Sequence, residues 1–185
     1  MKTPVFKSQI LPGFLLFCAI FFASCNSSAQ KKAGAPEVDL HTAVITDDAE
    51  AVKQHIAAGS DLNEKDPFGG SSPLITAAVF GKTEMARLLL DAGADINFQN
   101  NEGSTALISA AFFGRPEIVK LLLDKKADKT IKNKYNTTAL DNVSAPFANV
   151  KDVYDMMGNM LAPMGLKLDY AYLEKIRPEI AKMLK

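Results

Sequence analysis

The clearest pattern along the chain is a block of helical hydrophobic positions that returns every 33 or 34 residues. The blocks are marked by Leu40, Leu74, Leu107 and Leu140. Small residues follow each of the two central leucines, and a leucine-rich run comes after a short polar break. A unit of this size cannot bury its apolar face alone, so units of this kind stack on one another. The pattern predicts an all-α solenoid of about four helix-turn-helix repeats.

The two central blocks match one another position by position. Residues 72–78 read SPLITAA and residues 105–111 read TALISAA, and each stretch is followed by a glycine, Gly81 or Gly114. A leucine-rich run then leads to Gly-Ala-Asp at 93–95 in the first of them. These motifs resemble the ankyrin repeat, with its TPLH-x-AA opening, central glycine and GAD exit. The resemblance implies short β-turn fingers between the repeats and a concave face that binds a protein.

Four repeats are expected in a domain covering residues 37–185. Their approximate limits are 37–70, 71–103, 104–136 and 137–185. In the first repeat, Gln54 and His55 stand where later repeats have leucines, and we interpret them as the polar outer face of a terminal cap.

The fourth repeat departs from the pattern. Its expected second helix is missing after Leu140, whereas residues 177–184, RPEIAKML, closely reproduce residues 115–122, RPEIVKLL. We infer a helical hairpin of residues 144–175 inserted between the two helices of this repeat. The first part of this segment has apolar residues at helical spacing, namely Val150, Val153, Tyr154, Met157, Met160 and Leu161. The alternative is that residues 145–185 form a C-terminal cap of extra helices.

The N-terminal residues predict an export signal. Lys2 and Lys7 precede an uncharged apolar run that is too short to span a bilayer as a helix. The sequence Phe-Ala-Ser-Cys at 22–25 resembles a bacterial lipoprotein lipobox, which implies that residues 1–24 are a signal peptide and that Cys25 is lipidated. Residues 25–36 then form a flexible tether. An ordinary secretory signal or a buried N-terminal helix is the alternative.

Composition argues against most kinds of chemistry. Lysine plus arginine and aspartate plus glutamate both number 21, so the formal net charge is zero, which disfavours nucleic acid as a partner. Two cysteines and two histidines leave little material for a metal site. Gly81-Lys82-Thr83 lacks the earlier glycine of a phosphate-binding loop, because Thr76 stands in its place. We therefore expect no catalytic residues, no metal, no cofactor and no enzymatic activity.

The ankyrin resemblance places partner-binding residues just before the glycine of each helix turn and at the finger tips. These are Phe68, Val79, Phe80, Asn101, Glu102, Phe112, Phe113, Lys134 and Tyr135. Aromatic residues on an exposed apolar face are common interface anchors, although one ring of each pair could turn into the core instead.

The methionines support an alternative function. Met156, Met157, Met160 and Met164 lie close together in the sequence, and clustered thioethers can bind Cu(I). Methionine also fills gaps on an amphipathic helix face. The main expectation is a monomeric, non-catalytic protein-binding module in the bacterial cell envelope, facing the periplasm and touching the membrane only through its lipid. The alternative is a periplasmic metal-binding or redox-protection factor.

Overall fold

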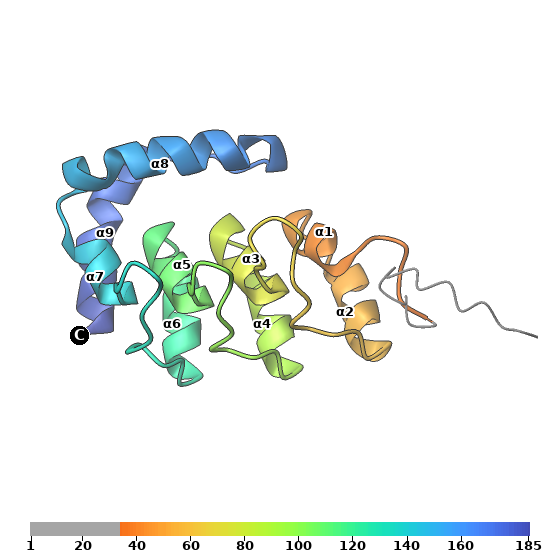
Figure 1. Cartoon of the computed structure of the whole chain (residues 1–185). Coiled ribbons are helices and arrows are strands. Elements are labelled where there is room, and N and C mark those ends of the chain that lie inside the picture. Colours follow the sequence, from red (N-terminus) through yellow and green to blue (C-terminus); the bar gives the residue numbers. More distant parts are fainter. Residues whose placement is uncertain (1–33) are drawn as a thin grey trace, which may run out of the picture. The chain divides into compact units, whose positions relative to one another are not determined.

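The computed structural model describes residues 34–185, and the predicted signal peptide, Cys25 and most of the tether lie outside this range. Within it the secondary structure is helical and contains no strand, which confirms the all-α expectation. The helices are α1 (Leu40–Ile45), α2 (Ala49–Ala57), α3 (Pro73–Phe80), α4 (Thr83–Asp91), α5 (Ala106–Phe112), α6 (Pro116–Asp124), α7 (Ala139–Ser144), α8 (Phe147–Leu161), the 3₁₀ turn η1 (Ala162–Met164) and α9 (Tyr170–Leu184) (Figure 1).

The first helix of each repeat begins at the same kind of residue. A side-chain oxygen accepts a hydrogen bond from a backbone N–H of the first turn in every case, and the four capping residues are Asp39, Ser72, Thr105 and Thr138. Such caps satisfy one of the N–H groups that a helix start leaves without a partner. The Asp, Ser or Thr before each apolar block therefore sets where each helix begins.

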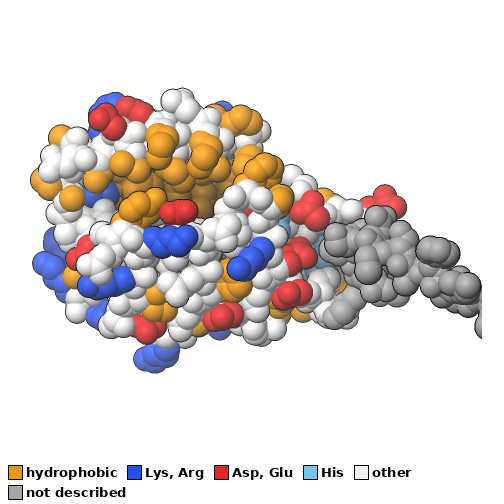
Figure 2. Space-filling view, in the orientation of Figure 1, with side chains coloured by type: hydrophobic (Ala, Val, Ile, Leu, Met, Phe, Trp, Pro, Cys, Tyr) orange, Lys and Arg blue, Asp and Glu red, His pale blue; other side chains and the backbone are white. Residues whose placement is uncertain are grey.

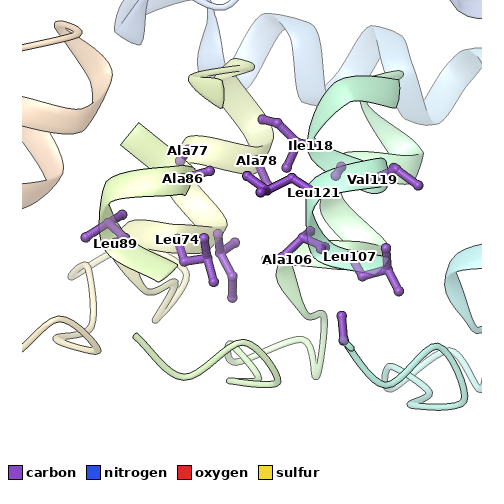
Figure 3. Packing of buried hydrophobic residues seen from close by; sticks show 14 of the residues in the cluster. Leu74, Ala77, Ala78, Ala86, Leu89, Ala106, Leu107, Ile118, Val119 and Leu121 are labelled. Atoms are coloured by element: carbon purple, nitrogen blue, oxygen red, sulfur yellow. The ribbon is translucent and has the colours of Figure 1, made fainter. Parts of the chain in front are cut away.

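The helices form two layers. Helices α1, α3, α5 and α7 pack side by side in one layer, and α2, α4, α6 and α9 follow one another in the second layer. The hydrophobic core is one cluster of buried residues that continues from repeat to repeat, and it includes Ala77 and Ala78 of α3 and Ala106 and Leu107 of α5 (Figure 3). Small side chains allow the first-layer helices to pack closely, and the second-layer leucines such as Leu89 complete the burial.

The fingers between repeats are built on one polar residue that recurs at the repeat spacing. The Asp66 carboxylate accepts hydrogen bonds from the backbone N–H groups of residues 68, 69 and 71, and Asn100 and Asn133 make similar bonds in the next two fingers. Adjacent fingers are also joined by backbone bonds, from Asn101 N to Gly69 O and from Lys134 N to Glu102 O. The fingers therefore form one continuous row.

The C-terminal residues form one helix where two segments were expected. Residues 177–184 do not start a separate helix, because α9 is continuous from Tyr170 to Leu184 and holds Pro178 in its interior. The matching proline of repeat three, Pro116, stands in the first turn of α6 instead. Helix α9 packs on α6 and α7, as α6 packs on α4 and α4 on α2, so its second half takes the place of the missing second helix.

The interpretation of His55 as a solvent-facing cap residue is wrong. Its side chain is 7% exposed, with Nδ1 bonded to Ser60 Oγ at 3.0 Å and Nε2 to the Val38 carbonyl oxygen at 2.8 Å. The chain preceding α1 covers this face, and two hydrogen bonds satisfy the buried ring nitrogens. Gln54 beside it is exposed, as expected for the end of the repeat stack.

Candidate functional site

Helix α8 crosses above the turn ends of the repeat helices and stands apart from the stack along most of its length (Figure 1). Its one buried side chain is Tyr154, whose ring stacks on Phe112 of α5 with centroids 4.4 Å apart. The ring of Phe147, also on α8, stacks with the Tyr154 ring at a centroid distance of 5.5 Å. The helix is thus fixed at its first half by aromatic contacts, and the second half extends over repeats two and one.

Buried polar atoms complete this attachment. The Tyr154 hydroxyl donates a hydrogen bond to the carbonyl oxygen of Phe112 and accepts one from Nη1 of Arg177. Nη2 of Arg177 donates to the Ala145 carbonyl oxygen at 2.8 Å. Burial raises the pKa of the Tyr154 hydroxyl, and the neighbouring guanidinium opposes that rise. The Tyr154 hydroxyl therefore stays protonated and remains a donor at neutral pH.

The structure changes the assignment of the two aromatic residues at the turn of repeat three. Phe113 is only 4% exposed and belongs to the buried core, so its predicted availability to a partner is wrong. Its backbone follows the end of α5, and its ring meets Phe112 edge-on at 5.0 Å. Phe112 is half-buried beneath Tyr154. Tyr154 of α8, rather than an external partner, therefore covers the Phe112 ring.

The turn of repeat two remains accessible. Phe80 and Val79 are half-buried, and Phe80 lines a cleft of about 320 Å³ below the far end of the hairpin. The other lining residues are Ile45, Lys82, Arg115, Met164, Gly165, Leu166 and Lys167. In the space-filling view, apolar side chains line the hollow beneath α8 (Figure 2). The cleft thus combines apolar walls with three cationic side chains.

Arg115 is the most enclosed of these cations. Its Nη2 donates a hydrogen bond to the Val79 carbonyl oxygen at 3.2 Å, and its side chain lies against Gly81. Nε is buried and has no hydrogen-bond partner in the described residues. Burial lowers the pKa of the Arg115 guanidinium, while Tyr172 and Glu117 act in the opposite direction. The group still carries its charge at neutral pH.

The finger row presents the exposed members of the predicted binding set. Phe68 is 87% exposed and Tyr135 is 70% exposed, while Asn101, Glu102 and Lys134 are exposed as well. The Tyr135 hydroxyl donates to Glu102 Oε2 at 3.0 Å, which fixes the ring on the neighbouring finger. These five side chains lie along fingers that are hydrogen-bonded to one another, so they share one surface.

The methionine cluster is open to solvent for the most part. Met156, Met160 and Met164 are exposed and Met157 is half-buried. Within residues 34–185, no group of three or more histidine, cysteine, aspartate or glutamate side chains could hold a metal ion. The helices of this same stretch also include none with the length and apolar character needed to cross a membrane.

Comparison with known proteins settles the family. A family model described as "Ankyrin repeats (3 copies)" matches residues 40–133, slightly more than half of the chain. The chain belongs to the ankyrin repeat family. Ankyrin repeats are generally non-catalytic modules for protein interaction, so the coarse function of this ankyrin repeat chain is protein binding.

Two curated ankyrin relatives and one solved structure show how far the similarity extends. Over 64 residues the chain is 36% identical to protein phosphatase 1 regulatory subunit 27 of Homo sapiens and of Mus musculus, covering 35% of this chain and 41% of each relative. The crystal structure of the ankyrin repeat domain of Bcl-3, a member of the IkappaB protein family, superposes with a TM-score of 0.55 and 36% identity. That match covers 63% of this chain and 50% of the other, so the chain spans half or less of each protein.

Two parts of the site in this ankyrin chain did not follow from the sequence. The apolar spacing from Val150 to Leu161 predicted an amphipathic helix, but it did not show that Tyr154 would cover Phe112. In the sequence Arg115 is only one residue of a repeated motif, and no motif marks Lys167. The signal in the sequence for the contact between Tyr154 and Phe112 is that Tyr154 is the single aromatic residue in the middle of the apolar face.

Proposed function

We propose that this chain is a non-catalytic, lipid-anchored binding protein of the bacterial envelope that recognises a protein partner through its fingers and its helix turns. The lipobox-like sequence at 22–25 and the charged start before an apolar run support the anchor on Cys25. Membership of the ankyrin repeat family supports a protein as the partner. The polar tether then holds the repeat domain at the membrane surface, on the periplasmic side.

The observation that carries this proposal is the exposed row of finger side chains. Phe68 and Tyr135 are large aromatic residues that the fold leaves open at its surface, at a cost in hydration that a partner would relieve. The Tyr135 ring is already held by Glu102, so little side-chain freedom is lost on binding. Preorganised aromatic residues are typical anchors of protein interfaces.

A pull-down tests the binding surface. The full chain is expected to retain a discrete protein from solubilised envelope membranes, and Phe68→Ala with Tyr135→Ala should remove it. Lys120→Ala on the exposed face of α6 is the control, because this lysine lies on a second-layer helix and, among residues 34–185, forms an ion pair only with Asp124. The retained protein is then purified and its affinity measured directly. Equal retention by all variants would remove the finger row from the proposal.

Labelling with a fatty acid tests the anchor separately. The wild-type chain should incorporate the labelled acyl group and fractionate with membranes, whereas Cys25→Ala should accumulate as an unlabelled precursor. Equal labelling of the two chains would show that Cys25 is not the modified residue. This experiment leaves the binding surface untouched, so the two halves of the proposal can fail independently.

A further inference from the structure

The cleft below the end of the hairpin has an unusual balance of charge. Lys82, Arg115 and Lys167 line it, and its described lining contains no acidic side chain. Lys82 Nζ lies 3.5 Å from Asp47 at an exposed edge. Neither Arg115 nor Lys167 has a carboxylate within ion-pair distance in residues 34–185. The cleft therefore has more positive charge than the surrounding residues neutralise.

Arg115 is the clearest case of a positive charge that the surrounding residues leave unneutralised. Its guanidinium is partly withdrawn from water, yet the only hydrogen bond it donates to the described residues goes to the Val79 carbonyl oxygen. The buried Nε has no acceptor there. A partly buried arginine without a counter-ion is costly, and a carboxylate at the accessible edge of the guanidinium supplies the opposite charge and charge-assisted hydrogen bonds. Glu117 also faces Arg115, but it lies beyond ion-pair distance and is exposed.

The apolar walls of the cleft are also incompletely covered. Phe80 and Ile45 come from the repeat stack, while Leu166 and Met164 come from the returning end of the hairpin. Met164 is 39% exposed and Met160, one turn earlier along the chain, is 59% exposed. Methionine side chains are flexible and adapt to apolar groups of different shape. This arrangement suits a ligand that brings an apolar side chain beside its negative charge.

We propose that this cleft binds an extended peptide segment of the partner protein in which an aspartate or glutamate stands beside a large apolar side chain. The carboxylate lies against Arg115 and Lys167, and the apolar side chain packs between Phe80 and Met164. The proposal rests on the protein-binding function argued above and adds the chemistry of the recognised segment. The charge complementarity favours an acidic peptide over a basic one.

The test is a selection of random dodecapeptides displayed on phage against the full-length chain in lipid nanodiscs, with empty nanodiscs as the counter-selection. Enriched peptides should carry an acidic residue next to phenylalanine, leucine or methionine. A synthetic peptide of the most enriched sequence, labelled with a fluorophore, then gives the dissociation constant by fluorescence anisotropy. Absence of any acidic and apolar enrichment overturns the proposal.

Variants locate the binding. The double change Arg115→Gln with Lys167→Gln should raise the dissociation constant of the synthetic peptide by about tenfold or more, because a desolvated charge pair is lost. Arg87→Gln on the exposed face of α4 is the matched control and should change nothing. Lys167→Gln alone guards against misfolding, since this side chain is exposed. Unchanged affinity in the double variant, with a normal melting curve, overturns the proposal.

Two further measurements use a reversed charge at residue 167 and sodium oleate as an alternative ligand. Lys167→Glu should weaken binding of the acidic peptide. It should strengthen binding of the same peptide when lysine replaces its acidic residue. If sodium oleate binds with the same dependence on Arg115 while no peptide is enriched, the ligand is a free amphiphile and the peptide proposal is wrong. If Phe68→Ala lowers the affinity for the partner but Arg115→Gln with Lys167→Gln does not, the proposed function stands and this inference alone is overturned.

Discussion

Arg177 Nη1 donates a hydrogen bond to the Tyr154 hydroxyl over 2.8 Å, and both side chains are almost completely buried. The same hydroxyl donates onward to the Phe112 carbonyl oxygen. This chain of bonds joins α9, α8 and α5, although Tyr154 and Arg177 are 23 residues apart. No carboxylate pairs with Arg177 in the described part of the chain, so neutral oxygens satisfy the buried guanidinium.

Tyr154→Phe should therefore lower the free energy of unfolding by about 1–3 kcal/mol, because it leaves a guanidinium N–H and a carbonyl oxygen without partners. Urea unfolding followed by circular dichroism measures the change. Tyr135→Phe is the control: its hydroxyl bonds to Glu102 in solvent, so its loss should leave the free energy of unfolding nearly unchanged. If both variants unfold at the wild-type midpoint, the buried bonds do not support the hairpin.

Gly114→Ala should destabilise the chain more than Gly93→Ala. Both glycines have positive φ, +66° and +90°, so an alanine at either position costs about 1–2 kcal/mol of backbone strain. A Cβ at residue 114 would also lie 2.7 Å from Leu173 Cδ2, whereas nothing lies within 4 Å at residue 93. The clash adds about 1–3 kcal/mol.

A double variant checks the cause of that difference. Leu173→Ala removes the clashing methyl group, so its effect and that of Gly114→Ala should sum to less than their separate costs. Additive costs in thermal unfolding would mean that α9 does not pack on the turn of repeat three as described.

Acid should weaken the first finger through Asp66. Partial burial alone would raise the pKa of this carboxyl, but hydrogen bonds from the backbone N–H groups of Gly69, Phe68 and Ser71 bring it below 3.8. A lowered folded-state pKa contributes stability above the unfolded value, and this stability is lost as the pH falls through the folded value. Asp66→Asn, which places the residue of the next finger here, should unfold earlier than wild type at pH 7.

The two chains should then converge as the pH falls from 3.8 through the lower folded-state pKa of Asp66, where the aspartate of the folded chain takes up its proton. Melting temperatures measured from neutral pH to acid follow this convergence. Asp128→Asn should show the same convergence of melting temperatures with wild type in acid, because hydrogen bonds from Thr130 also lower the pKa of the exposed Asp128 carboxyl. A constant gap between wild type and Asp66→Asn at every pH contradicts the role of ionised Asp66.

Phe113→Ala and Phe80→Ala should separate stability from binding. Truncating the buried Phe113 ring should cost about 3–5 kcal/mol of folding free energy, as for other core aromatic residues. Phe80 is half-buried in the wall of the open cleft, so its truncation should cost less stability and reduce partner affinity more. Thermal unfolding and titration with the purified partner give the two values. Equal melting temperatures for the two variants would contradict this division.

Local chemistry made much of the repeat fold predictable. The Ser or Thr caps at 72, 105 and 138, the alanines after Leu74 and Leu107 and the glycines of the turns all act within one repeat or between neighbours. Their effect depends on short sequence separations, so it can be recognised from the periodic pattern alone. The exposed finger residues, including Phe68 and Tyr135, were predictable for the same reason.

The sequence by itself determined the repeats, the amphipathic character of residues 150–161 and the helical identity of 177–184. Only the tertiary structure decided that Tyr154 covers Phe112, that Phe113 is core and that Arg115 meets Lys167 in one cleft. The physical reason is that the path of the hairpin depends on contacts between residues distant in the chain. An apolar helix face shows that the helix packs against another surface, but the packing of the whole fold decides which surface that is.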